Sequence, residues 1–125
     1  MILGVGIDVV RIDRIAHWWE NPGLVARYFH PLEIESIRRK GGGVAGSLAA
    51  RFAAKEAFAK ALGTGLRGFS LNEVQVENDP HGRPYLVLHG RARDLFARRG
   101  GARAHLSLTH EKDAAIAVVV IEGDV

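Results

Sequence analysis

The stretch Arg51–Gly63, RFAAKEAFAKALG, decides the fold. It lies in a longer alanine-rich segment, 44–62, which stops at a Gly-Thr-Gly sequence, as helices commonly do. Apolar side chains occur around most of this segment, so it must be covered on several sides. We therefore predict a central helix over Val44–Leu62, interrupted by four charged residues: Arg51, Lys55, Glu56 and Lys60.

The four charges of the central helix form two stripes of i, i+4 neighbours. Arg51 and Lys55 form one stripe, and Glu56 and Lys60 form the other, about 100° or more away around the helix axis. The second stripe shares its side of the helix with Phe52, which is unusual for a solvated surface. An ordinary ion pair between Glu56 and Lys60 on the helix surface is the alternative interpretation.

Shorter elements precede the central helix. Met1–Asp8 is rich in Ile, Val and Gly and predicts a buried strand that ends at Asp8. A short helix is expected over Asp13–Glu20, where the sequence Asn-Pro-Gly at 21–23 stops it. A further helix is predicted over Pro31–Lys40, because proline at its start, Glu33 in its first turn and three basic residues in its last turn suit the helix dipole.

The elements after the central helix are mostly strands. Residues 73–78 and 84–90 alternate in hydropathy around the turn sequence DPHGR, which predicts a hairpin. An amphipathic helix follows over Arg91–Arg99, and two closing strands are expected over His105–Thr109 and Ala114–Ile121. Because strands and helices do not alternate strictly, we predict an α+β fold with a mainly antiparallel sheet packed on the long central helix.

Composition limits the function classes. The 125 residues predict a single compact domain spanning 1–125, and the absence of cysteine excludes a disulfide framework, a thiolate nucleophile and a cysteine zinc site. No apolar run approaches the ~20 residues of a membrane helix, and no signal peptide is apparent, so we expect a cytoplasmic protein with no membrane partner. Arginine supplies 13 of the 17 basic residues, which favours an anionic substrate or partner.

Several familiar motifs fail on inspection. GVGIDV at 4–9 lacks the third glycine of a dinucleotide fingerprint, and GTGLRG at 63–68 lacks the ending of a phosphate-binding P-loop. His110-Glu111 has no second histidine for a zincin site. A Ser107, His110 and Asp113 triad can be drawn, but nothing in its spacing selects it.

A metal site is the more informative hypothesis. Asp8 is expected at the end of the first strand, where its carboxylate can face a helix packed across the sheet. Mg²⁺ is commonly held by one or two carboxylates plus phosphates and water, so Asp8 and Glu56 would leave room for a diphosphate. Lys60, one turn further along, could then neutralise or protonate a departing phosphate.

Three blocks of sequence give this hypothesis a context: GIDVVRIDR at 6–14, FAAKEAFAK at 52–60 and LSLTH at 106–110. With Gly63 and the hairpin sequence GRPY at 82–85, they resemble the signature blocks of the holo-acyl-carrier-protein synthase family of 4′-phosphopantetheinyl transferases. The resemblance extends over essentially the whole chain. It implies an enzyme that moves the phosphopantetheine arm of coenzyme A onto a serine of apo acyl carrier protein in fatty acid biosynthesis.

The resemblance also implies roles for individual residues. Asp8 and Glu56 would be the Mg²⁺ ligands, Glu56 and Lys60 the catalytic groups, and Glu56, or a metal-bound water oriented by Glu56 or Asp8, the base that activates the carrier serine. The expected coenzyme A contacts are Arg51, Lys60, Gly63, Pro84 and His110. Arg14 and Arg27 would bind the acidic carrier protein, with Trp18 or Trp19 adding apolar contact. A homotrimer with active sites between subunits is implied, and the valine-rich strand at 118–120 offers a surface for it.

Other functions are less well supported by the sequence. A broad-range transferase acting on polyketide or peptide carrier domains is the alternative within the enzyme class. A basic nucleic-acid module would use the arginine excess, but no RRM or zinc-finger pattern is present, so no nucleic-acid partner is expected. A catalytically silent scaffold would keep the fold without needing Asp8, Glu56 and Lys60.

Overall fold

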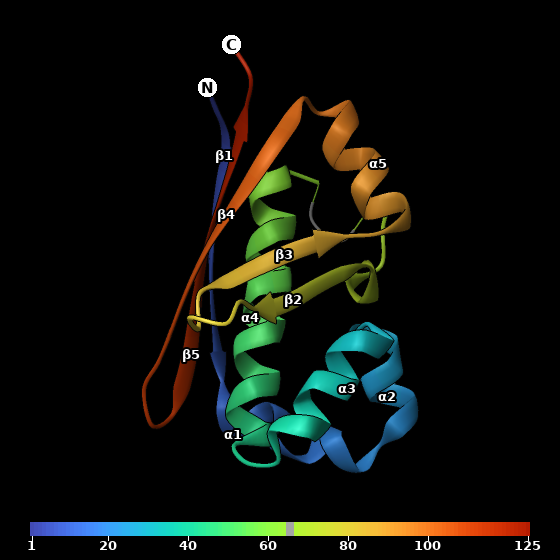
Figure 1. The fold of residues 1–125 in the computed structure, drawn as a ribbon, viewed down its shortest axis with the longest axis vertical. Coiled ribbons are helices and arrows are strands. Elements are labelled where there is room, and N and C mark those ends of the chain that lie inside the picture. Colours follow the sequence, from blue (N-terminus) through green and yellow to red (C-terminus); the bar gives the residue numbers. More distant parts are fainter. Residues whose placement is uncertain (65–66) are drawn as a thin grey trace.

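The computed structural model describes residues 1–64 and 67–125 (Figure 1). A long strand leads into a group of short helices, the central helix follows, and a hairpin, one helix and two long strands complete the chain. In chain order the elements are β1 (Ile2–Arg11), α1 (Ile12–Ile15), the 3₁₀ helix η1 (Ala16–Glu20), α2 (Pro22–Tyr28), α3 (Pro31–Lys40), α4 (Val44–Leu62), the 3₁₀ helix η2 (Leu71–Glu73), β2 (Val74–Asn78), β3 (Pro84–Leu88), α5 (Gly90–Arg98), β4 (Gly101–His110) and β5 (Ala114–Gly123).

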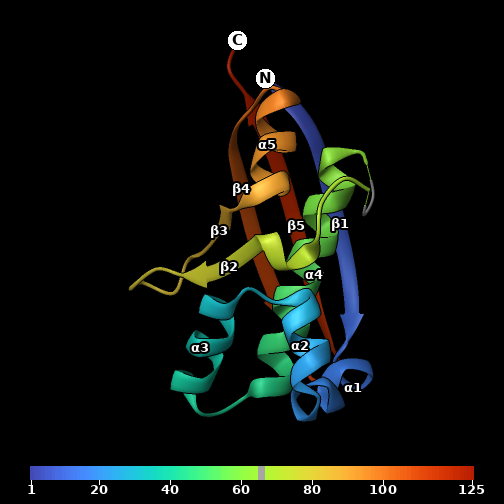
Figure 2. The ribbon, with the colours of Figure 1, turned by 90° about the vertical axis from the view of Figure 1, so that its right-hand side faces the viewer.

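Helix α4 lies between two antiparallel sheets. Strands β1, β5 and β4 form one sheet in that order, and β2 and β3 form the second. Figures 1 and 2 show α4 running along the larger sheet, with the β2–β3 hairpin crossing its other side and α3 packed nearby. The predicted α+β fold, with antiparallel sheet on a long central helix, is confirmed.

Strand β1 approaches α4 unusually closely, because glycine occupies two alternate positions on its inner face. A Cβ atom added at Gly4 would lie 1.8 Å from the carbonyl oxygen of Ala61, and one added at Gly6 would lie 1.9 Å from that of Ala57. No side chain fits at either position. The two glycines of GVGIDV therefore serve close packing, and Asp8, the next residue on the same face, lies beside α4.

The two faces of the larger sheet differ sharply. Alternate residues of β5 are buried against α4: Ala115, Ala117, Val119 and Ile121. On the outer face, Val5, Ile7 and Val9 of β1 are 62%, 57% and 58% exposed, and they pair with Val120, Val118 and Ile116 of β5. The β1–β5 part of the outer face is thus an apolar surface that residues 1–64 and 67–125 do not cover, whereas β4 adds His105, Ser107 and Thr109 beside it.

The structure corrects several predicted boundaries. Strand β1 continues to Arg11, so Asp8 lies within the strand, paired with Ala117, and not at its end. The helix expected over Asp13–Glu20 is divided into α1 and η1.

Helix α2 is absent from the sequence predictions. Asn21, expected only to stop a helix, also caps a new one by accepting a hydrogen bond from the amide of Leu24. Strands β4 and β5 are longer than predicted. No helix in the described parts of the chain is long and apolar enough to cross a membrane.

The glycine contact yields a stability prediction. Gly6→Ala should lower the free energy of unfolding by about 1–3 kcal/mol or more, because β1 must move away from α4 to admit the methyl group. Thermal or urea unfolding at fixed protein concentration measures the change. Gly42→Ala is the matched control, since a Cβ atom there meets nothing within 4 Å. Equal stability of the two variants would contradict the close-packing role.

Candidate active site

Asp8, Glu56 and Lys60 converge where β1 passes α4, and we call them the carboxylate–lysine cluster. The Lys60 ammonium donates to Asp8 Oδ1 at 2.9 Å and to the carbonyl oxygen of Ile7 at 3.0 Å. The ion pair thus joins the helix to the strand, in place of the Glu56–Lys60 pair considered from sequence. The predicted meeting of Asp8 with the second charged stripe is confirmed.

The pKa of Glu56 reports the environment of the cluster. Partial burial raises this pKa above its ordinary value, and the nearby Asp8 carboxylate raises it further, while the charges of Lys60 and Arg14 oppose the shift. Two carboxylates held close enough to repel each other are a suitable donor pair for a hard divalent cation. Among the described residues no group of three or more acidic, histidine or cysteine side chains could form a fuller ligand shell.

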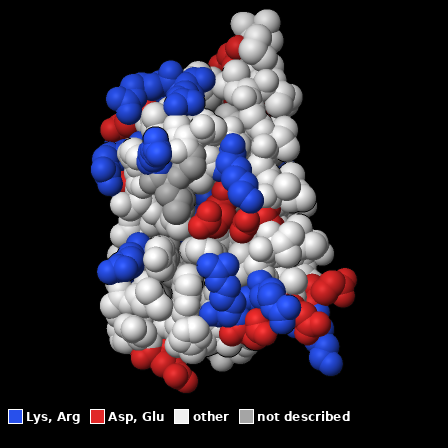
Figure 3. All heavy atoms as spheres, turned by 180° about the vertical axis from the view of Figure 1, so that it is seen from behind, with Lys and Arg blue, Asp and Glu red and all other residues white. Residues whose placement is uncertain are grey.

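Of the two arginines predicted to bind the carrier protein, Arg14 lies near the cluster. Arg14 lies on α1 and Arg27 on α2, and both are exposed. The effect of Arg14 on Glu56 shows that it is close to the carboxylates. Figure 3 shows acidic side chains near the middle of one face, with basic side chains on either side of them.

The two tryptophans beside these helices make contacts within the chain. Trp18 stacks on Tyr28 and meets Phe52 edge-on, with ring centroids 5.2 and 5.1 Å apart. The Arg38 guanidinium lies 5.8 Å from the ring centroid of Trp19. Both tryptophans remain half-buried, so each keeps some accessible surface.

Three other predicted residues line a cavity of about 400 Å³ at the N-terminal half of α4. Arg51 contributes from α4, Pro84 from the start of β3, and His110 from the end of β4. We call this cavity the Arg51 pocket. Its other lining residues are Lys40, Gly43, Gly46, Ser47, Ala50, Val76, Asn78, Gly82 and Leu108.

The Arg51 pocket and the carboxylate–lysine cluster occupy different sides of α4. Arg51 and Glu56 are five residues apart and therefore about 140° apart around the helix axis. Neither Gly63 nor Lys60 lines the pocket. Gly63 ends α4 with a left-handed backbone (φ 83°), and its amide donates to the carbonyls of Ala59 and Lys60.

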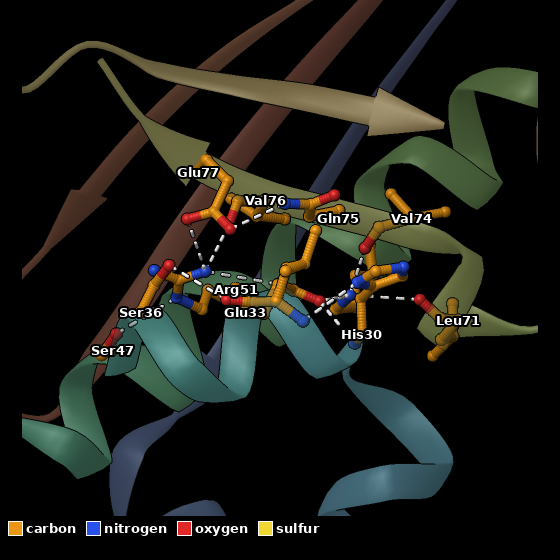
Figure 4. A network of polar contacts seen from close by, with 12 residues as sticks. His30, Glu33, Ser36, Ser47, Arg51, Leu71, Val74, Gln75, Val76 and Glu77 are labelled. Atoms are coloured by element: carbon orange, nitrogen blue, oxygen red, sulfur yellow. Dashed lines mark hydrogen bonds and ion pairs between the residues drawn. The ribbon is translucent and has the colours of Figure 1, made fainter. Parts of the chain in front are cut away.

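Behind the pocket lies a buried network of charges that the sequence did not predict (Figure 4). Glu33 of α3 is fully buried, and its Oε1 accepts from Lys55 Nζ at 2.5 Å and from the amide of His30 at 2.9 Å. Glu33 Oε2 accepts from Arg51 Nη1 at 3.5 Å. Burial lowers the pKa of Lys55 to about 8, although the Glu33 carboxylate opposes this shift.

Lys55 and Arg51 also bind the edge of β2 that β3 leaves unpaired. Lys55 donates to the carbonyls of Val74 and Leu71, and Arg51 donates to the carbonyl of Val76. Side chains four residues apart on a helix are separated by about 6 Å, and carbonyls two residues apart on a strand by about 6.8 Å. This match lets one helical stripe hold the hairpin that supplies the opposite wall of the pocket.

The structure excludes the Ser107, His110 and Asp113 triad, because successive side chains of β4 point to opposite faces of the sheet. Ser107 pairs with Val118 on the outer face of the sheet, whereas His110 pairs with the buried Ala115 on the inner face. The two side chains therefore leave β4 in opposite directions.

The sequence profile of the 4′-phosphopantetheinyl transferase superfamily matches residues 4–119. The chain belongs to this superfamily. The "Holo-[acyl-carrier-protein] synthase" of Treponema denticola is 54% identical over 98% of this chain and all of its own length. The protein of the same name from Trichlorobacter lovleyi is 51% identical and covers 98% of both chains. The resemblance inferred from three sequence blocks is confirmed.

Solved structures of the superfamily share the fold. The holo-[acyl-carrier-protein] synthase of Neisseria meningitidis has a TM-score of 0.89 at 35% identity, covering 98% of this chain and 99% of its own. The acyl carrier protein synthase of Plasmodium yoelii with ADP bound has a TM-score of 0.91 at 28% identity, covering 100% and 98%. The Helicobacter pylori enzyme in complex with coenzyme A has a TM-score of 0.80 at 29% identity, covering 94% and 99%.

The two lysines of α4 are predicted to contribute very different amounts to stability. Lys55→Met should lower the free energy of unfolding by about 3–5 kcal/mol, because it leaves the buried Glu33 without its closest counter-charge. Lys60→Met should cost no more than about 1 kcal/mol, because the Lys60 side chain is 55% exposed. Urea unfolding of both variants at one protein concentration measures the difference. Similar losses would contradict this division of roles.

Proposed function

We propose that this chain is a holo-[acyl-carrier-protein] synthase, which transfers the 4′-phosphopantetheine arm of coenzyme A to a serine of apo acyl carrier protein and releases adenosine 3′,5′-bisphosphate. The observation that carries the proposal is the convergence of Asp8, Glu56 and Lys60 from two elements in a chain 54% identical to a protein of that name. Phosphoryl transfer requires positioning and charge neutralisation more than covalent catalysis, and these residues supply both.

The residues of the cluster have distinct parts in the reaction. The serine hydroxyl attacks the phosphorus that bears the pantetheine arm, and the bond to the nucleotide phosphate breaks. Glu56 accepts the serine proton, directly or through water. Lys60 stabilises the charge that develops on the leaving phosphate.

Asp8 and Glu56 would also hold a divalent cation, whose charge would stabilise the diphosphate of coenzyme A. The Lys60 ammonium, 2.9 Å from Asp8, keeps the acidic pair partly neutralised and remains within reach of the substrate. Mg²⁺ suits two oxygen ligands with open positions for phosphate and water, so we keep it as the expected cation.

The Arg51 pocket suits the phosphorylated end of coenzyme A. Arg51, Lys40 and His110 contribute cationic or titratable groups from three elements, and Pro84 adds an apolar surface. Lys60 and Gly63 lie with the cluster on the other side of α4, where they would contact the diphosphate and the arm. The acidic carrier protein would approach across Arg14 and Arg27, which places its serine near Glu56.

This division favours an active site built between two copies of the chain. One copy would provide the carboxylate–lysine cluster and its neighbour the Arg51 pocket. The uncovered apolar face of β1 and β5, including Val5, Ile7 and Val118, gives the copies a surface to bury. We keep the homotrimer as the expected assembly, and the cytoplasm as the expected location.

The reaction is tested by the mass of apo acyl carrier protein after incubation with the chain, coenzyme A and Mg²⁺. We expect a phosphopantetheine adduct on one serine. Asp8→Ala should remove most activity, and Lys60→Ala should lower kcat by roughly 10²- to 10³-fold while barely changing stability. An unmodified carrier protein with the unaltered enzyme, or normal kcat in Lys60→Ala, would contradict the assignment.

The shared site predicts complementation between defective copies. Asp8→Ala lacks a working cluster and His110→Ala an intact pocket, so each should be impaired alone. When the two are co-expressed in equal amounts, about a quarter of the neighbouring pairs combine an intact cluster with an intact pocket, and activity should rise above the sum of the separate variants. A sum without such a gain would indicate that each copy acts alone.

A further inference from the structure

The guanidinium of Arg51 is held from one side. Its Nε donates to Ser47 Oγ at 3.3 Å, and its Nη1 donates to the carbonyl of Val76 and to Glu33 Oε2 at 3.5 Å. An arginine has five N–H donors, and the two on Nη2 have no hydrogen-bond acceptor among residues 1–64 and 67–125. These two donors are available to an anion in the pocket that Arg51 lines.

Glu77 stands in a different relation to Arg51. Its Oε1 lies 3.8 Å from Arg51 Nη1, within the range of an ion pair but too long for a hydrogen bond. The contacts to Ser47, Val76 and Glu33 already fix the guanidinium. Glu77 therefore contributes negative charge to Arg51 more than geometry.

The Glu77 carboxylate is itself held in place. Gln75, which is buried, donates from Nε2 to Glu77 Oε2 at 2.8 Å, and its Oε1 lies 2.8 Å from His89 Nε2. Figure 4 shows Glu77, which lies on β2, beside the guanidinium of Arg51, which lies on α4. Glu77 does not line the Arg51 pocket, so it acts on a ligand there by its charge and without touching it.

Charge balance in the network follows from these contacts. Arg51 and Lys55 carry two positive charges, and Glu33 and Glu77 carry two negative charges. These four charges of the buried network thus cancel before any anion binds, and Lys40 adds a positive charge to the wall of the pocket. A phosphate bound by Arg51 is attracted by a guanidinium whose charge is partly offset by Glu77, so it binds less tightly than it would to an isolated arginine.

We propose that Glu77 is a positioning residue of an electrostatic kind: it offsets the charge of Arg51 and so limits how tightly the pocket holds the phosphorylated nucleotide. The inference rests on the proposed function, since it takes coenzyme A and adenosine 3′,5′-bisphosphate as the ligands of the pocket. Glu77 would thereby speed product release, because a pocket that holds the bisphosphate less tightly releases it faster.

The test is the affinity of Glu77→Gln for adenosine 3′,5′-bisphosphate, measured by calorimetry. Gln is nearly the same size and can still accept the Gln75 hydrogen bond. We expect Kd to fall roughly three- to tenfold, with a lower product-inhibition constant, and with the gain reduced at high salt. Affinity for uncharged adenosine should not change. The thermal midpoint should rise more on adding the bisphosphate than it does in the unaltered protein.

Matched variants separate charge from other effects. Glu35→Gln makes the same change in net charge on the exposed side of α3 and should leave Kd unchanged. Glu77→Asp keeps the charge and should bind as the unaltered protein does. Gln75→Met releases the Glu77 carboxylate toward solvent and should shift Kd in the same direction as Glu77→Gln, by less. Gln75→Met also supplies the test if Glu77→Gln fails to fold.

The outcomes distinguish this inference from the proposed function. Unchanged or weaker bisphosphate binding in Glu77→Gln, in a protein that still transfers phosphopantetheine, would overturn the role of Glu77 alone. If Glu77 had only a structural role, its replacement would leave bisphosphate binding unchanged or weaken it, because a loss of stability cannot tighten binding. An unaltered protein that neither binds the bisphosphate nor modifies the carrier would overturn the proposed function and this inference together.

Discussion

The close contact between β1 and α4 is the constraint on which the candidate site depends. Gly4 and Gly6 let the strand backbone rest against Ala61 and Ala57, and any side chain would hold the two elements apart. Asp8 follows on the same face, so its carboxylate reaches Lys60 at 2.9 Å. An ion pair of this kind, half-exposed, is too weak to bring a strand and a helix together. Packing sets the distance between β1 and α4, and the ion pair between Asp8 and Lys60 forms because that distance is short.

Helix α4 then acts as a common support for two kinds of chemistry. Its exposed stripe faces β1 and carries the groups suited to a diphosphate, while its buried stripe faces β2 and holds the hairpin that forms one wall of the Arg51 pocket. Because the two stripes point in different directions, one chain presents two partial sites. The uncovered outer face of the sheet provides a means of bringing partial sites from different copies together.

The sequence predicted the fold and the cluster largely because both depend on local patterns. Alanine content and the terminal glycine identified α4, and i, i+4 spacing separated its two stripes. The role of GVGIDV was missed, since a glycine needed for close approach looks like one needed for a turn until the partner helix is placed. Glu33 was assigned to the helix dipole, because a first-turn carboxylate shows no sign of burial in sequence. Lys55 could have been suspected from its place beside Arg51 on an apolar helix.

The buried stripe is best explained by the backbone it serves. Replacing a buried ion pair by apolar side chains is often neutral or favourable, which would make Lys55 and Glu33 costly choices for a core. Here, however, Lys55 also satisfies the carbonyls of Leu71 and Val74, and Arg51 that of Val76. An apolar pair in place of Lys55 and Glu33 would leave the carbonyls of Leu71 and Val74 without the Lys55 donor, each at a cost of about 1–3 kcal/mol. A two-stranded hairpin has no third strand to supply those donors, so the charged side chains of α4 take its place.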